Sequence, residues 1–147
     1  MFGVQRISTR TVDRVDEKTA TALARLLPQV SSRGSPLSRG RIESVVSSAS
    51  TRIIVADLDG HIVGMALLCV CTTLAGEFGV VEEVAVDESA RGNHVGVEIM
   101  VTLLETAERL GLDFVELTSR PARQAANGLY QSLGFELRQT NLYRYPL

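Results

Sequence analysis

The stretch "VVEEVAVDESARGNHVGVEIMVTLLETAERLG", residues 80–111, decides the fold of this chain. It opens with a β-branched run typical of a strand, continues through a polar segment that holds two glycines, and ends as an amphipathic helix that stops at Gly111. One stripe of that helix is apolar and comprises Met100, Leu103, Leu104, Ala107 and Leu110. The stretch therefore predicts a strand, a loop and a helix in direct succession.

The segments after this stretch predict a second strand beside the first. "DFVELTS" (113–119) is typical of a strand, "PARQAANGLYQSLG" (121–134) of a helix and "FELRQTNLYRY" (135–145) of a closing strand. A β-α-β unit places its two strands in parallel, so we expect the strand that ends at Val86 to neighbour the strand at 113–119.

The segments before this stretch predict antiparallel strands and two helices. "VQRIST" (4–9) is typical of a strand, "DEKTATALARLLPQV" (16–30) of a helix, and the region 41–48 of a short helix. Asp59-Gly60 is a strong hairpin signal, and a second turn is expected near Gly76 or Gly79. Three antiparallel strands should therefore run from about Thr51 to Val86.

Together these segments predict an α/β fold with a mixed, mainly antiparallel twisted sheet of about six or seven strands and helices on both faces. The 147 residues predict a single domain, 1–147, because a chain of this length buries a sufficient core by itself. The loop "SSRGSPLSRG" (31–40) is too polar to pack, and it is either a surface connector or a substrate-facing segment.

Composition and charge exclude several classes of partner. The net charge is −2 and Lys18 is the only lysine, so no basic tail or stripe indicates nucleic acid. The longest apolar run, residues 62–71, is about half of the roughly 20 residues that a membrane span requires, and no leader segment is evident. We expect a cytoplasmic protein without nucleic-acid or membrane contacts.

The two cysteines, Cys69 and Cys71, share one face of a predicted strand. Two residues at this spacing cannot easily form a disulfide within a strand, and only His61 and His94 are available as histidine ligands. We interpret the cysteines as inert thiols and expect no metal site.

The loop "VDESARGNHVG", residues 86–96, lies where a strand ends and a helix begins. Free backbone N–H groups and the helix dipole favour an anion at such a position. Gly92 and Gly96 permit close approach of a ligand to the backbone, and Arg91 adds a guanidinium that suits phosphate. The loop lacks the GK[ST] and G-x-G-x-x-G patterns of nucleotide and dinucleotide sites, and the glycines alone also fit an ordinary tight turn.

Two motifs resemble the GNAT superfamily of acyl-CoA-dependent N-acetyltransferases. Residues 80–111 resemble its coenzyme-A-binding motif, Q/R-x-x-G-x-G/A after a strand, and "RQAANGLYQSLGF" (123–135) resembles its next motif with a tyrosine before Gly-Phe. This sequence departs from the pattern at His94, which replaces the first motif glycine, and at Arg123, where many members have asparagine.

The resemblance implies that acetyl-CoA binds along the strand end and the loop after it. The pantetheine arm would pair with the strand backbone, and main-chain N–H groups would hold the pyrophosphate. The implied binding residues are Val84, Ala85, Val86, Arg91, Gly92, Asn93, His94, Val95, Gly96 and Val97. No side chain identity tests the main-chain roles, because any residue except proline supplies an N–H.

The resemblance also implies the acid–base residues of the reaction. Tyr130 matches the motif tyrosine and would donate a hydrogen bond to the departing sulfur, although a helix tyrosine at the core boundary is the alternative. In a regular strand Glu82 and Glu83 point to opposite faces, so only one can face the acceptor. Glu82 is the predicted base, because some family members that acetylate small amines carry a glutamate at the matching place, acting through water, whereas others use other positions or no dedicated base. Tyr143 and Tyr145 share a strand face and either line the acceptor site or pack on the sheet.

The resemblance thus implies an N-acetyltransferase that moves an acetyl group from acetyl-CoA to a primary amine by direct attack in a ternary complex. The acceptor is expected to be a small-molecule or peptide amine, and a homodimer is possible by analogy with relatives. The alternative is a non-catalytic member of the same fold that senses CoA or binds a protein.

Overall fold

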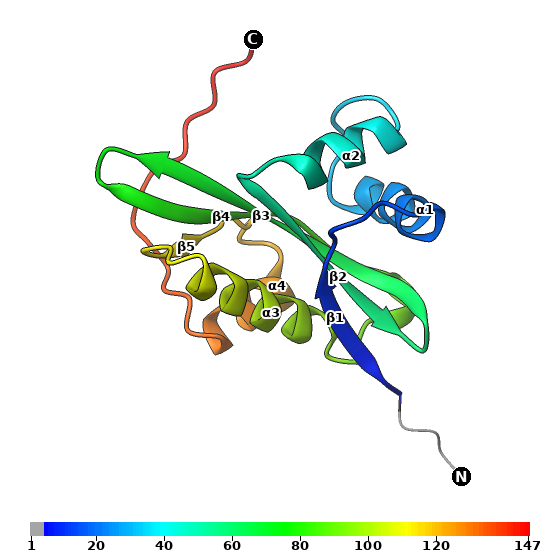
Figure 1. The fold of residues 1–147 in the computed structure, drawn as a ribbon. Helices are drawn as coiled ribbons and strands as arrows, with labels where there is room; N and C mark the ends of the chain where they lie inside the picture. The colour runs from blue at the N-terminus through cyan, green and yellow to red at the C-terminus, as the bar shows by residue number, and fades with distance from the viewer. Residues whose placement is uncertain (1–4) are drawn as a thin grey trace.

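The computed structural model describes residues 5–147, and in this part of the chain a five-stranded sheet carries helices on both faces (Figure 1). The strands are β1 (Ile7–Thr11), β2 (Thr51–Leu58), β3 (His61–Thr73), β4 (Gly76–Val86) and β5 (Val115–Glu116). The helices are α1 (Glu17–Leu26), α2 (Arg39–Ser47), α3 (Val95–Arg109) and α4 (Gln124–Ser132), and short 3₁₀ turns occupy Leu27–Gln29 and Glu88–Ala90. Within the described residues, none of the helices is long and apolar enough to cross a membrane.

The strands lie in the order β1-β2-β3-β4-β5, as in the chain. Neighbours from β1 to β4 are antiparallel, whereas β4 and β5 are parallel. The predicted mixed, mainly antiparallel sheet is therefore confirmed, as is the parallel pair on either side of α3. The second hairpin turns at Leu74 and Ala75, directly before Gly76, the first residue of β4, while Gly79 lies inside β4.

The β2–β3 hairpin forms where Asp59-Gly60 predicts it. Both residues have a positive φ, 50° at Asp59 and 84° at Gly60. Two successive residues with positive φ characterise the type I′ turn, whose twist matches that of paired strands. Local sequence thus determines this connection.

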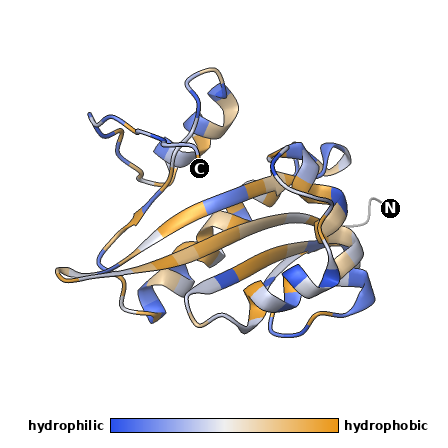
Figure 2. Cartoon of the chain, turned by 90° about the horizontal axis from the view of Figure 1, so that it is seen from above, coloured by the Kyte–Doolittle hydropathy of each residue, from blue (hydrophilic) through white to orange (hydrophobic). Residues whose placement is uncertain are grey.

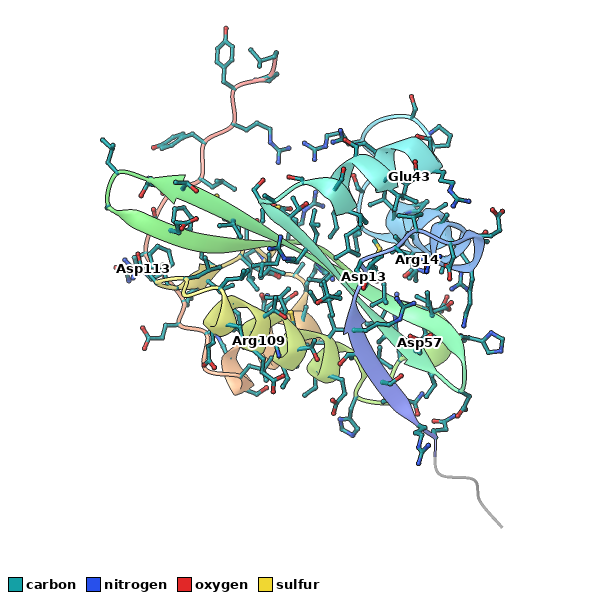
Figure 3. The ribbon with its side chains drawn as sticks, in the orientation of Figure 1. Asp13, Arg14, Glu43, Asp57, Arg109 and Asp113 are labelled. Atoms are coloured by element: carbon teal, nitrogen blue, oxygen red, sulfur yellow. The ribbon has the colours of Figure 1, made fainter. Side chains whose placement is uncertain are left out.

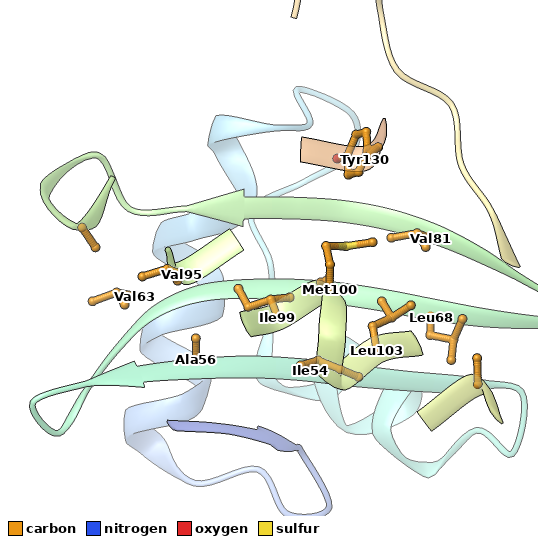
Figure 4. Packing of buried hydrophobic residues seen from close by; sticks show 13 residues of the cluster. Ile54, Ala56, Val63, Leu68, Val81, Val95, Ile99, Met100, Leu103 and Tyr130 are labelled. Carbon is orange, nitrogen blue, oxygen red and sulfur yellow. The ribbon is translucent and has the colours of Figure 1, made fainter. Parts of the chain in front are cut away.

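Two hydrophobic clusters lie on opposite faces of the sheet. The cluster under α3 includes Ile99, Met100 and Leu103 and extends from Ile54 and Ala56 on β2 to Tyr130 on α4 (Figure 4). The other cluster joins the apolar sides of α1 and α2 to the sheet and includes Leu23, Leu26, Ile42, Val55 and Met65. Colouring by hydropathy shows the central strands as predominantly apolar, whereas the helices carry polar outer faces (Figure 2).

A β-bulge interrupts β4 at Glu83. Leu67 pairs with Glu82 and Met65 pairs with Ala85, so two steps on β3 oppose three steps on β4. Glu83 has φ 55°, in the left-handed region that non-glycine residues rarely adopt. Val81 and Ala85 are four residues apart and would face the same side of a regular strand. Because of the bulge, Val81 packs in the cluster under α3, whereas Ala85 packs in the cluster under α1 on the other face.

Two expectations about strands are wrong. The described chain has five strands instead of six or seven, because residues 135–145 form no strand and the strand at 113–119 shortens to the two residues of β5. The segment after α4 runs away from the rest of the domain (Figure 1), so its backbone has no strand of its own chain to pair with. The expected strand at 4–9 begins at Ile7, and Val4 lies outside the described residues.

Candidate active site

The loop between β4 and α3 presents a continuous run of free main-chain N–H groups. Within the described chain, the N–H groups from Gly92 to Val97 donate to no protein acceptor, and the first such bond of α3 runs from the Glu98 N–H to the His94 carbonyl at 3.1 Å. His94 precedes the helix without capping it through its side chain. Six successive N–H groups at the start of a 15-residue helix therefore remain available to an anion.

The backbone of this loop explains where the family places glycine. Gly92 has φ 85°, and His94 has φ 61° and ψ 20°, so both adopt the left-handed conformation. Glycine enters this region without the steric cost that a Cβ adds, about 1–2 kcal/mol for most residues. His94 keeps the loop shape that a motif glycine gives, and its side chain is exposed.

Asp87 holds the start of the loop. Its carboxylate accepts hydrogen bonds from the Ser89 N–H at 3.2 Å and the Ser89 hydroxyl at 3.1 Å, and it forms an ion pair with Arg25 of α1 at 3.0 Å. These interactions, led by the hydrogen bond from the Ser89 N–H, lower the pKa of Asp87 below its ordinary value. The Asn93 side chain donates to the Ala90 carbonyl at 3.1 Å and closes the turn.

Part of one edge of β4 is unpaired beside this loop. β4 pairs with β5 only at Gly79–Val115 and Val80–Glu116, so the edge from Val81 to Val86 has no strand partner on that side within residues 5–147. An extended ligand can pair with such an edge as an added strand. The Ser119 hydroxyl, just beyond β5, is buried without a hydrogen-bond partner in the described chain and so offers a polar group near this opening.

Gly96, in the first turn of α3, lies close to Leu129 of α4. A Cβ at this position would lie 3.3 Å from Leu129 Cδ2 and 3.9 Å from Val86 Cγ2. The absence of a side chain at Gly96 thus allows α4 to approach α3, in addition to any role toward a ligand. A bulky residue at Gly96 would disturb this packing as well as the loop.

The bulge changes how Glu82 and Glu83 lie relative to the sheet. Glu82 pairs with Leu67, so it lies on the same sheet face as that residue, the face that carries α1 and α2. Glu83 lines a cavity on this same face together with Leu67 and Met65, whereas Glu82 is exposed and does not line it. The expectation that the two glutamates point to opposite faces is wrong, because the extra residue breaks the alternation of the strand.

The cavity beside Glu83 has a volume of about 630 Å³ and is bounded by α1, the loop 31–38, α2 and the sheet. Apolar side chains form most of its wall, and they include Leu23, Leu27, Leu37, Ile42, Val45, Ile53, Met65 and Leu67. Arg33 and Arg41 lie at its polar part with Glu83. The loop 31–40 therefore contributes to the cavity in addition to connecting α1 and α2.

Burial raises the pKa of the Glu83 carboxyl above its ordinary value, and repulsion from Glu82 acts in the same direction. Arg33 and Arg41 oppose this shift, because their charges favour the carboxylate. A carboxyl whose pKa moves toward neutrality is better matched to accepting a proton near pH 7. Glu83 combines this property with half-burial and a place on the cavity wall.

Tyr130 lies on α4 at the margin of the cluster under α3 and is 7% exposed (Figure 4). Its ring meets that of Phe135 edge-on, with centroids 5.9 Å apart. Burial raises the pKa of the phenol, and Arg123 partly opposes this effect, so the hydroxyl keeps its proton at neutral pH. The side chain of Asn127 donates to the Arg120 carbonyl at 3.0 Å and fixes the start of α4.

Three other residues that the sequence singles out do not line this cavity. Tyr143 and Tyr145 are each 86% exposed in the segment after α4 and do not line the cavity. Cys69 is a free, half-buried thiol whose pKa is raised by burial and then by Glu82. Among residues 5–147, no group of three or more His, Cys, Asp and Glu side chains is placed to hold a metal ion.

Sequence reasoning missed several residues of this region. Arg33 and Arg41 belong to a loop and a helix that carry no motif. Glu83 was passed over because regular strand alternation would place only one of Glu82 and Glu83 on the side of the cavity. The cluster of arginines in "SSRGSPLSRGR" (31–41) was the available signal for a polar function. Ser119 had no signal in the sequence, because the burial of its hydroxyl is visible only in the folded chain.

The element order, the mixed sheet and the opening between β4 and β5 define an N-acetyltransferase fold, as the resemblance predicts. The model of the acetyltransferase (GNAT) family matches residues 21–135, and the chain belongs to this family. No curated protein sequence matches the chain.

Solved structures share the fold over nearly the whole chain. An aminoglycoside acetyltransferase, meta-AAC0020, from an uncultured soil metagenomic sample has a TM-score of 0.85 at 17% identity and covers 96% of each chain. Glucosamine-6-phosphate N-acetyltransferase from Arabidopsis thaliana has a TM-score of 0.78 at 19% identity, with 95% of this chain and 98% of that chain covered. The aminoglycoside N-acetyltransferase AAC(6')-Iy, in complex with CoA, has a TM-score of 0.79 at 15% identity, with 99% and 98% covered.

Proposed function

We propose that this protein transfers an acetyl group from acetyl-CoA to a primary amine in a ternary complex. The observation that carries the proposal is the run of six free N–H groups from Gly92 to Val97, placed at the start of α3 and beside the open edge of β4. This combination suits a ligand that has a diphosphate at one end and an amide-containing arm at the other. Membership of the GNAT family supports the same reading.

The donor would lie along β4 and reach the loop before α3. Main-chain groups of Val84, Ala85 and Val86 pair with the amides of the pantetheine arm, and Arg91 adds a charge beside the pyrophosphate. The N–H groups from Gly92 to Val97 hold the phosphate oxygens, assisted by the helix dipole. AAC(6')-Iy, which shares the fold at 15% identity, was solved in complex with CoA, and this supports CoA as a ligand of the fold.

We place the base at Glu83 instead of Glu82. Glu83 lines the cavity on the acceptor side, is half-buried and has a raised pKa, whereas Glu82 is exposed outside it. Glu83 accepts the proton of the bound ammonium, directly or through water, and leaves the free amine that attacks the thioester carbon. The C–N bond forms first and gives a tetrahedral intermediate, and the C–S bond breaks as this intermediate collapses to the amide. The nitrogen loses its second proton in this step, and that proton replaces, directly or through water, the one that Tyr130 gives to sulfur.

Tyr130 supplies the proton that the departing sulfur needs. Its phenol is protonated at neutral pH because burial raises its pKa, and it lies on α4 next to the α3 side of the opening. A phenol donates a hydrogen bond that strengthens as negative charge develops on sulfur. An N–H near Val84 or Ala85 stabilises the oxygen of the tetrahedral intermediate.

The fold does not determine which amine an acetyltransferase accepts. The relatives named above include acetyltransferases of aminoglycosides and of glucosamine-6-phosphate, which differ in charge. We infer a small-molecule or peptide amine, since the cavity of about 630 Å³ suits a ligand of modest size.

Two measurements test this function. Titration calorimetry with acetyl-CoA reports donor binding, and release of free thiol in the presence of an amine panel reports transfer. We expect binding together with amine-dependent thiol release. Binding without release from any amine would support a CoA sensor, and the absence of both would support a protein-binding member of the fold.

A further inference from the structure

The polar part of the cavity beside Glu83 is positively charged overall. Two guanidinium groups, Arg33 and Arg41, and one carboxylate, Glu83, line it. Both arginines act on the charge of Glu83, since each lowers the pKa of its carboxyl. The three groups thus lie within electrostatic reach of one another, although they come from the 31–38 loop, α2 and β4.

Neither arginine has an acidic partner within the described chain. The ion pairs of residues 5–147 use other cations, namely Arg10, Lys18, Arg25 and Arg39. Arg39, close to both in sequence, instead bonds to Glu43 at 3.0 Å and to the Val15 carbonyl at 2.7 Å. The guanidinium groups of Arg33 and Arg41 are therefore free to bind a ligand at a cavity that is otherwise mainly apolar.

We propose that the acceptor is an amine that also carries a carboxylate or a phosphate. Arg33 and Arg41 bind the anionic group, and Glu83 receives the ammonium at the other end of the polar part. This inference deepens the proposed function and rests on it for the transfer step. Guanidinium groups suit both anions, because their planar N–H pairs match two oxygens of either.

The same charges act against a polycationic acceptor. Each further ammonium near Arg33 and Arg41 adds repulsion in a partly enclosed site, and only Glu83 among the cavity-lining residues offsets it. A polycationic aminoglycoside therefore fits the charge of this cavity poorly. The acceptors of the aminoglycoside acetyltransferases that share the fold do not carry over to this chain.

Matched amines test the proposal. The panel pairs an amino acid with its amide, an amino sugar with its phosphate ester, and adds one polycationic aminoglycoside. We expect kcat/KM for thiol release to be at least about tenfold higher for the anionic member of one pair, and the two pairs distinguish carboxylate from phosphate. Arg33→Gln and Arg41→Gln should each reduce this ratio, whereas Arg109→Gln, on the opposite face of the sheet (Figure 3), should preserve it.

A direct binding measurement separates this inference from the proposed function. Calorimetry with the anionic amines alone should show binding that weakens in Arg33→Gln and Arg41→Gln, whether or not acetyl-CoA binds. Equal or better turnover of the neutral or polycationic amines would overturn the inference while leaving acetyl transfer intact. Failure of the protein to bind acetyl-CoA would overturn the proposed function, and failure to bind any anionic amine would overturn the inference.

Discussion

The proposed donor and acceptor regions meet at β4, but main-chain groups form the first and side chains form the second. On the donor side, the loop before α3 offers main-chain N–H groups from Gly92 to Val97. On the acceptor side, the cavity offers the side chains of Arg33, Arg41 and Glu83. A main-chain site survives most substitutions, whereas a side-chain site changes with each one, so the family can keep one donor while its acceptors diverge.

Glu83→Gln is expected to have the largest effect. Loss of the base should lower kcat about 10²- to 10⁴-fold, because the amide cannot take the proton of the ammonium. Acetyl-CoA affinity, measured by calorimetry, should stay near that of the unmodified protein. Glu82→Gln is the matched control, and a greater loss of kcat in Glu82→Gln than in Glu83→Gln would return the base to the neighbouring residue.

Tyr130→Phe probes the acid on the donor side of the opening. The ring should keep its edge-on contact with Phe135, so the melting temperature should change little. Loss of the hydroxyl should reduce kcat by about ten- to a hundredfold with little change in the KM for acetyl-CoA, since its hydrogen bond strengthens in the transition state. An unchanged kcat would assign Tyr130 to packing alone.

Val97→Pro tests whether main-chain atoms bind the donor. Proline removes one N–H from the run but is tolerated in the first turn of a helix, where that N–H has no internal partner. We expect acetyl-CoA affinity to fall by about tenfold, because hydrogen bonds to charged groups are the stronger ones. Val97→Ala, which keeps the N–H, should bind normally, and equal losses in both variants would point to the side chain.

The pH profile tests the charges around Glu83. Because burial and Glu82 raise its pKa, kcat/KM should fall as the pH drops through a midpoint above the ordinary value of a glutamate. Arg33 and Arg41 face the same carboxyl and lower its pKa, so Arg41→Gln should move the midpoint upward by about one pH unit or less. A midpoint that moves downward would contradict the arrangement.

The sequence predicted the strand, loop and helix around the proposed donor site well, because local residues determine these elements. Glycine at 92, the start of an amphipathic helix at Val95 and the β-branched run before the loop are features of consecutive residues. The effect of His94 needed the structure, which shows that this position has a left-handed backbone.

The acceptor side was less predictable because it depends on contacts between distant segments. Its wall combines α1, a loop, α2 and three strands, and no motif connects these parts. The expectation that Glu82 and Glu83 point to opposite faces was wrong because alternation holds only in an uninterrupted strand. The closing strand at 135–145 was predicted from its residues, but a strand also needs a partner, which this chain alone does not supply.

The bulge at Glu83 has a consequence for the evolution of this strand. Deleting Glu83 would leave Val81 and Val84 toward α3 and Ala85 toward α1, now with regular pairing to β3. Hydrophobic packing alone therefore does not require the extra residue, and selection for folding would favour its loss. The presence of Glu83 in a backbone conformation that carries a steric cost is what its proposed role as the base would account for.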